Sequence, residues 1–565
     1  MSGSTRKSST IIAFVAVLLL VLLGAGAVGA STGRGDVSAK DNVIRFTSAF
    51  GTQFAGPNFN PYSGASDGST QLMFLPLEVW NFLKDSFTPM IATRHRLLGT
   101  NGVEFTLRPG MKWSDGRPIT AKDVIFSFTL LQKHPALDSF GVMSHVASVR
   151  ASGRTVTFTY KGPNSQVHKL IANTWIVPSH QWTSVSDPVT FANATPIVSG
   201  PYALGRYTST RIILKRNPRF FAASTVVIPE MHATPMNPAT NLQDLAAGRW
   251  DWAAVGDPNP GGLERDWVSR DRKHNRYWIV PFGIVTMYLN TAKAPFNDAA
   301  FRQALSYGLD RALVGKRATP AGYSPPAAQT GLLPHEKAWL DPSIPNAGRI
   351  SHDPTKARAI LAAAGYKLAD GRLLGKDGKP ISFTLQIPNG FNDWIAGAQV
   401  IKKQWGELGI DLTIDTPQIP AVIGSLVTGN YDAVEWITAI DGGPYFNLNQ
   451  VLNSRLTADI GQPAPANWGR YRSNVADRLL AQVVESGTLA GQKKALHRLQ
   501  RIVYNRVPFL ELTYFPLWYE FRTDKYVGWP DAKNPYSYGN PPPGGIGPKR
   551  TWMLLVVTNL RRAEA

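Results

Sequence analysis

The sequence contains no cysteine among its 565 residues. This absence excludes disulfide bonds, thiolate metal sites, cysteine catalysis and a lipid-modified N-terminal cysteine, so we do not expect a lipoprotein. Concentrated charge is missing as well. The formal net charge is +20, but the lysines and arginines are scattered along the chain. No run has the density of a nucleic-acid-binding arm, and we expect no nucleic-acid partner.

The usual catalytic and cofactor motifs are also scarce. The ten histidines are isolated, and no phosphate-binding loop or dinucleotide fingerprint occurs, so we expect neither metal nor cofactor. The stretch GASDG at 64–68 matches G-x-S-x-G around Ser66. It lacks the preceding strand that a nucleophile elbow needs. A carboxylate pair for glycoside hydrolysis needs only proximity in space, so a secreted hydrolase stays an alternative.

A long apolar run is found once, at the N-terminus. Arg6 and Lys7 precede IIAFVAVLLLVLLGAGAVGA, which ends in small residues. We predict that residues 1–31 are a signal peptide cleaved near Ala30, or an uncleaved membrane anchor. Either way, the chain from about residue 35 onward lies outside the cytoplasm, secreted or at the outer face of the membrane. The later stretch TWMLLVVTNL is too short to span a bilayer and is typical of a buried strand.

Aromatic residues are abundant. Trp and Tyr number 16 and 18, and hydrophobic residues make up 43% of a chain too long for one core, which predicts two or three globular domains. Such rings can stack on sugars or line pockets for peptide side chains. Those in loop-like settings are Trp80, Trp182, Trp436, Tyr445 and Trp468.

The segment GMKWSDGRPITAKDVIFSF at 110–128 has a well-defined local structure. The preceding residues 103–107 alternate as in a half-buried strand. Thr120 fits a helix N-cap, and Asp123 can complete a capping box. Trp113 looks exposed in this pattern. All these features describe framework, and none requires a ligand.

The second half of the chain predicts alternating strands and helices. A strand at 381–387, a helix at 394–408 and a strand at 410–414 form a βαβ unit with parallel pairing. Asn297 is placed to cap an earlier helix, and Asp353-Pro354 to start another. Two helices between about 474 and 506 lead into the strand PFLELTYF. The fold class is therefore α/β with at least two lobes.

Several of these stretches together resemble the family 5 extracellular solute-binding proteins, the dipeptide- and oligopeptide-binding components of ABC importers. The family signature is reproduced by 112–116, Pro118 and 120–124. The similarity continues in family order from about 43 to 530. The further matching stretches are GPYALGRYTSTRIILKRNPRFF, YLNTAKAPFNDAAFRQALSYGLDRALV, HDPTKARAILAAAGY, ELGIDLTI, YDAVEW and SNVADRLL.

The resemblance implies a two-lobed, periplasmic-binding-protein-like clamshell with an extra subdomain in the first lobe. Lobe I would comprise 43–60, 198–285 and 508–560, with the extra subdomain at 61–197; lobe II would be 286–507. Such a protein, expected to be a monomer without a cofactor, captures a small-molecule ligand between its lobes and delivers it to a membrane permease. It makes and breaks no bond.

The resemblance also suggests the ligand site. In peptide-binding relatives an Asp nine residues after the Tyr-Asp motif pairs with the peptide's α-ammonium, which places Asp441 in that role; Asp441 can equally be a turn residue before two glycines. The Trp expected three residues earlier is Thr438, while Trp436 lies on the same strand face. Tyr445 and Asn58, in the loop GPNFNP, complete the predicted ligand-binding set.

The ligand class is left open between two alternatives. The Glu-Trp pair that oligopeptide binders often carry is not found around Gln418 and Ile419. Some relatives bind oligosaccharides, which the many tryptophans would suit. Oligopeptides are the first expectation and oligosaccharides the second.

Overall fold

The computed structural model describes residues 42–237, 239–257, 259, 261–438, 442–541 and 551–564. The predicted signal peptide or anchor at 1–31 lies outside these residues. The chain divides into two compact units. The first comprises Met1–Asp257, Gly262–Ile279 and Trp518–Ala565; the second comprises Pro258–Gly261 and Val280–Leu517.

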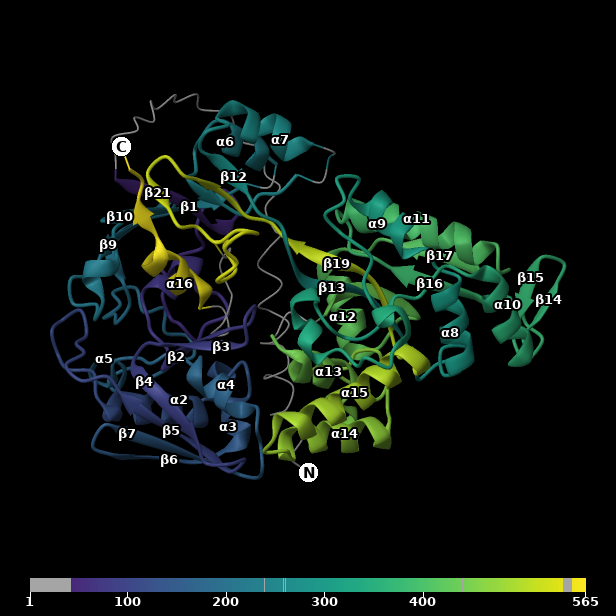
Figure 1. Cartoon of the computed structure of the whole chain (residues 1–565), viewed down its shortest axis with the longest axis horizontal. Coiled ribbons are helices and arrows are strands. Elements are labelled where there is room, and N and C mark those ends of the chain that lie inside the picture. The colour runs from purple at the N-terminus through teal and green to yellow at the C-terminus, as the bar shows by residue number, and fades with distance from the viewer. Residues whose placement is uncertain are drawn as a thin grey trace. The chain divides into compact units, whose positions relative to one another are not determined.

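The first unit is built on a seven-stranded mixed sheet (Figure 1). Strand β1 is the middle strand of this sheet and pairs in parallel with β10. Phe46 of β1 is fully buried and packs against Trp252 at 5.7 Å between ring centroids, which places the core at the middle of the sheet. The strands, in sheet order, are β12 (Asn275–Tyr277), β20 (Glu520–Arg522), β11 (Trp252–Ala253), β1 (Val43–Phe50), β10 (Glu230–Met236), β9 (Arg211–Arg216) and β8 (Tyr202–Thr208).

A second, four-stranded sheet in this unit carries the capped helix. Its order is β4 (Ala92–Leu97), β5 (Gly102–Leu107), β7 (Thr155–Tyr160) and β6 (Val146–Ser152). Helix α2 (Ala121–Lys133) starts with the predicted capping box between Thr120 and Asp123. Its Phe128 packs edge-on against Phe158 of β7 at 4.6 Å. Trp113 is fully buried, so its expected exposure was wrong: the turn folds this ring into the interior.

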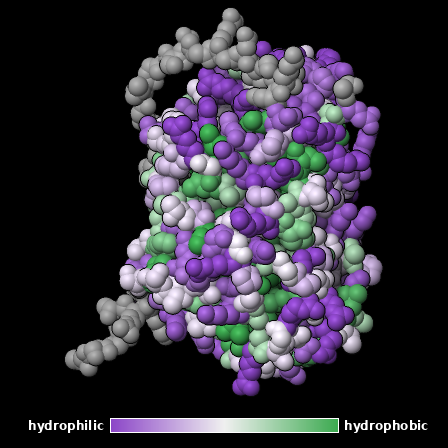
Figure 2. All heavy atoms as spheres, turned by 90° about the vertical axis from the view of Figure 1, so that its left-hand side faces the viewer, coloured by the Kyte–Doolittle hydropathy of each residue, from purple (hydrophilic) through white to green (hydrophobic). Residues whose placement is uncertain are grey.

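The remaining elements of the first unit are short. They are η1 (Gly68–Leu72), β2 (Glu78–Asn81), β3 (Ser86–Pro89), η2 (Pro135–Leu137), α3 (Val142–His145), α4 (Val167–Ala172), α5 (Ser179–Trp182), η3 (Ala223–Thr225), α6 (Asn241–Ala246), α7 (Gly262–Asp266), η4 (Val268–Arg270), β21 (Tyr526–Val527), α16 (Trp552–Asn559) and β22 (Arg561–Arg562). On the face drawn in Figure 2, hydrophobic side chains are scattered among hydrophilic ones.

The second unit contains a five-stranded sheet. The order is β17 (Asp411–Asp415), β16 (Ser382–Gln386), β18 (Ala433–Thr438), β13 (Val280–Leu289) and β19 (Leu510–Leu517). Strands β16 and β17 pair in parallel and are joined by α11 (Asn392–Gly406), which confirms the predicted βαβ unit. Trp405 of α11 is fully buried, and its indole N–H donates to the Leu305 carbonyl at 3.1 Å.

Helices and hairpins complete the second unit. They are α8 (Ala299–Tyr307), α9 (Arg311–Ala318), η5 (Pro334–Trp339), η6 (Pro345–Gly348), α10 (Pro354–Ala363), β14 (Lys367–Ala369), β15 (Arg372–Leu374), α12 (Ile419–Thr428), α13 (Pro444–Leu452), η7 (Ser454–Leu456), α14 (Asn474–Glu485) and α15 (Leu489–Arg506). No helix within the described ranges is long and apolar enough to cross a membrane.

Three details differ from the sequence-based expectations. The segment TWMLLVVTNL forms helix α16, with 552–557 buried, because an apolar run of this length suits a buried helix as well as a strand. Asp298, one residue after Asn297, caps α8 by accepting from the Ala300 N–H at 2.9 Å. Finally, β13 and β19 pair with each other within the second unit, so the units divide at 279/280 and 517/518, whereas we expected 285/286 and 507/508.

Candidate functional site

Strand β18 positions two of the predicted ligand-binding residues, Trp436 and Thr438. Alternation along the strand puts both side chains on the same face of the sheet. The Trp436 ring is 6% exposed and lies 6.4 Å from the rings of both Phe391 and Trp394, at the start of α11. The three rings form an aromatic cluster at the end of the strand that leads toward residue 441.

Thr438 is buried and already has a hydrogen-bond partner. Its hydroxyl lies 2.7 Å from the hydroxyl of Thr286 on the neighbouring strand β13. Both threonines are at most 3% exposed. This pair ties β18 to β13 and makes Thr438 a support for the strand.

The remaining predicted residues are placed less closely together. Asp441 lies outside the described residues. Tyr445 is half-buried on α13, where burial raises the pKa of its hydroxyl to about 12, and its ring packs against Phe446. Asn58 belongs to the first unit, where its side-chain carbonyl accepts from the Asn60 N–H and its amide donates to Ser63. Of the five predicted ligand-binding residues, the structure places only Trp436 and Thr438 together, on one face of β18.

Glu435, between Ile437 and Ala433 on the opposite face of β18, was not singled out from the sequence. It is 2% exposed, and its Oε1 has no hydrogen-bond partner. Burial raises the pKa of Glu435 to about 8, and the neighbouring Asp393 contributes in the same direction. The only signal in the sequence was one acidic residue inside the apolar strand AVEWIT.

The local fold does not support a role for Ser66 as the nucleophile of a hydrolase. Strand β1 ends at Phe50, and residues 51–67 contain no strand, so Ser66 does not sit on a strand-to-helix elbow. Among the described residues, no group of His, Asp and Glu is arranged to hold a metal ion.

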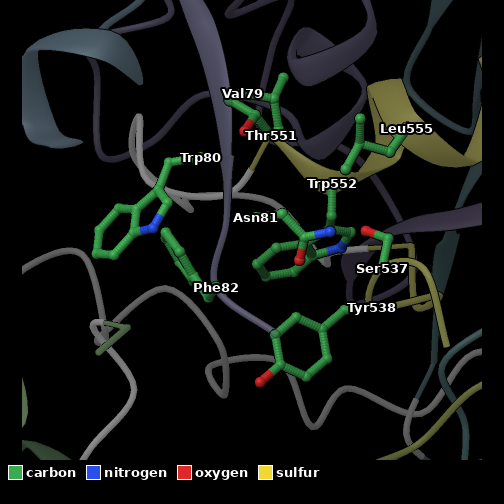
Figure 3. Close-up of a pocket in the computed structure, with 9 residues that line it drawn as sticks. All are labelled: Val79, Trp80, Asn81, Phe82, Ser537, Tyr538, Thr551, Trp552 and Leu555. Carbon is green, nitrogen blue, oxygen red and sulfur yellow. The ribbon is translucent and has the colours of Figure 1, made fainter. Parts of the chain in front are cut away.

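A small pocket in the first unit is too small for an organic ligand. Asn81, Tyr538 and Trp552 face one another across it, whereas the ring of Trp80 extends away from them (Figure 3). Its volume of about 10 Å³ corresponds to about one water molecule. The Asn81 side-chain amide is occupied by the Tyr536 carbonyl at 2.5 Å.

The fold is that of the two-lobed α/β periplasmic binding proteins. A solved oligopeptide ABC transporter periplasmic oligopeptide-binding protein of Thermotoga maritima superimposes with a TM-score of 0.82, at 23% identity, over 93% of this chain and 100% of that one. The structure of the same Thermotoga maritima protein with bound mannohexaose gives 0.74, at 22% identity, over 93% and 99%.

The family follows from the sequence match. The model of the bacterial extracellular solute-binding proteins, family 5, matches residues 87–456, and the chain belongs to this family. Protein XP55 of Streptomyces lividans is 30% identical over 364 residues, 63% of each chain. The periplasmic oligopeptide-binding protein OppA of Salmonella typhimurium is 23% identical over 423 residues, 67% of this chain and 70% of that one.

Proposed function

We propose that this protein is the extracytoplasmic substrate-binding component of an ABC importer and that it binds oligopeptides for delivery to a membrane permease. Family membership over 87–456 is the observation that carries this proposal. The similarity to the oligopeptide-binding protein OppA of Salmonella typhimurium supports the peptide class. The protein acts as a monomer, catalyses no reaction, and is secreted or held at the outer face of the membrane by its N-terminal apolar run.

The aromatic cluster of Phe391, Trp394 and Trp436 supports a ligand site at the end of β18. Apolar rings provide contact area for peptide side chains, and few polar groups are then needed to orient the backbone. Asp441, three residues past the strand, supplies the carboxylate for the α-ammonium group in this proposal. Capture between two lobes stays a prediction.

Titration calorimetry against peptide and glycan panels tests the ligand class. We expect saturable heat from peptides with a free N-terminus and much weaker binding of the N-acetylated versions of the same peptides. The N-acetylated peptides are the matched control because acetylation removes the α-ammonium charge and leaves every side chain unchanged. Heat from the oligosaccharides alone would overturn the peptide assignment.

An oligosaccharide ligand is the second candidate, and one observation favours it. The mannohexaose-bound structure shows that a protein with this fold binds a sugar chain. The cluster around Trp436 consists of aromatic rings, the side chains that stack on sugars. Manno-, cello- and chito-oligomers in the same panel decide between the two classes.

Asp441→Asn is the sharpest single-residue test of the peptide proposal. We expect peptide binding to weaken by about 1–3 kcal/mol, because a charged hydrogen-bond partner of the α-ammonium is lost. The matched control is Asp411→Asn, an exposed carboxylate at the far end of β17. Equal affinities of the wild type and the Asp441 variant would remove this residue from the site.

A secreted hydrolase is the alternative from another class. If the protein hydrolysed a peptide or glycan and Ser66→Ala abolished this activity, the result would support the hydrolase and overturn the transport proposal. We expect the incubated ligands to be recovered intact by mass spectrometry.

A further inference from the structure

The second unit contains a cavity that the proposed peptide site does not use. Its volume is about 440 Å³, and Arg302, Arg470, Arg472 and Asp459 contribute to its wall. Thr291, just after the end of β13, also lines it. Leu289 of β13 pairs with Ala433, the first residue of β18. The cavity therefore lies beside the start of β18, about 17 Å along the strand from Thr438 at 3.3 Å per residue.

Arg302 brings a buried positive charge to this wall. The residue is 3% exposed. Its guanidinium donates to the carbonyls of Val507 (2.7 Å), Arg506 (2.9 Å) and Phe296, the first two at the end of α15. No carboxylate among the described residues forms an ion pair with it. Asp298 favours its charged form from a distance but is bonded to Lys376 and to the N-terminus of α8.

Arg470 is the second buried cation, also 3% exposed. Its Nη2 donates to the carbonyls of Val427 (2.7 Å) and Gln462 (3.3 Å), which places it at the C-terminus of α12. Its Nε and Nη1 have no hydrogen-bond partner, and no described carboxylate pairs with it. Burial lowers the pKa of both Arg302 and Arg470, which reflects the cost of two charges without a counter-ion.

Arg472 completes the group at the open side of the cavity. Its side chain is 54% exposed and contacts Asp459 at 3.0 Å, but Asp459 is itself 90% exposed. An ion pair this exposed contributes little and exchanges readily with another anion. Three arginines thus line one cavity whose lining contains a single, weakly held carboxylate. The helix C-terminal carbonyls beside Arg302 and Arg470 supply only partial negative charge.

We propose that this cavity binds a small oxyanion, a carboxylate or phosphate group, held by Arg472 and stabilised by the charges of Arg302 and Arg470. Guanidinium forks match the geometry of both groups. The anion would displace Asp459 from Arg472. The site is separate from the proposed peptide site, so its occupancy does not require a peptide.

Calorimetry and thermal unfolding with inorganic phosphate and with citrate test this site, at constant ionic strength maintained with sodium chloride. We expect saturable binding by the full-length protein of at least one of the two, and which one binds distinguishes phosphate from carboxylate recognition. Arg472→Ala should weaken this binding by about tenfold, as loss of a charged hydrogen-bond donor does. Asp459→Asn should tighten it by about threefold, because the competing carboxylate is gone.

Arg455→Ala is the matched control, since Arg455 is an exposed arginine of η7 in the same part of the chain and does not line the cavity. We expect unchanged anion binding in this variant and unchanged peptide binding in all three. Absence of saturable binding in the wild type would overturn the proposal. Equal losses in Arg455→Ala and Arg472→Ala would also do so, because they would show non-specific charge attraction.

Discussion

Two buried carboxyl groups, one in each unit, are held in opposite ways. Asp123 of α2 is 3% exposed and accepts from the Thr120 N–H at 2.9 Å, and from the Ser179 N–H and hydroxyl at 3.0 and 2.8 Å. Glu435 of β18 is 2% exposed, and one of its oxygens accepts nothing. The first group is enclosed by donors. The second has an oxygen without a donor and lies near the carboxyl group of Asp393.

The difference separates a carboxyl group of the framework from one on the strand of the proposed ligand site. Burying a carboxylate is tolerable when several donors replace water, as they do for Asp123. A carboxyl without donors takes up a proton instead, which is why the pKa of Glu435 rises to about 8. Such a group is poorly stabilised by its own fold, and residues of this kind concentrate near functional sites.

Asp123→Ala should have the largest effect. We expect the free energy of unfolding of the first unit to fall by about 3 kcal/mol, because a cap is lost and the Ser179 N–H loses its acceptor inside the protein. Urea unfolding followed by circular dichroism measures this change. Glu104→Gln, on a half-exposed carboxylate of β5, is the control and should change stability by less than about 0.5 kcal/mol.

Glu435→Gln should raise the free energy of unfolding at high pH, whereas Asp123→Ala should lower it. The pKa of Glu435 is raised from 4.5 to about 8 on folding, so the native state binds the extra proton between these values and its stability falls as the pH rises through this window. We expect the variant to gain about 2 kcal/mol relative to the wild type at pH 8 and to differ little at pH 4.5. Urea unfolding at both pH values measures the difference. A pH-independent difference would show that Glu435 does not titrate in this way.

The Thr286–Thr438 hydroxyl pair should give a smaller effect that is not additive. Either Thr286→Val or Thr438→Val leaves one buried hydroxyl without its partner and should cost about 1–2 kcal/mol. The double variant should lose about 1 kcal/mol less than the sum of the two single variants. Denaturant unfolding of all four proteins measures this coupling; strictly additive losses would contradict the hydrogen bond.

Asp115→Asn should have the smallest effect of the four. Asp115 lies in the same segment as Asp123, but its contact with His180 at 2.9 Å is partly exposed, with 29% and 20% of the two side chains accessible. Exposed ion pairs contribute about 0.2–1 kcal/mol. We expect a change below about 0.5 kcal/mol by urea unfolding. A loss as large as that of Asp123→Ala would show that burial does not explain the contrast.

Much of the local structure could be predicted from the sequence. The Thr120–Asp123 cap depends on residues three apart, and the βαβ unit at 381–414 depends on local periodicity and Gly409, so neighbours in the chain carry both signals. Helix α16 was missed because a short, continuous apolar run such as 552–557 favours neither period. For the candidate site, Trp436 and its strand face could be predicted, but its contacts with Phe391 and Trp394 could not.

The sequence by itself determined the family, the helix caps and the alternation that puts Trp436 and Thr438 on one face of a strand. Only the tertiary structure decided that Thr438 is bound to Thr286, that one Glu435 oxygen lacks a donor, and that Arg302 and Arg470 line one cavity. Periodicity and capping act between residues a few positions apart. Burial and counter-charge depend on segments more than a hundred residues apart in the chain, which only folding brings together.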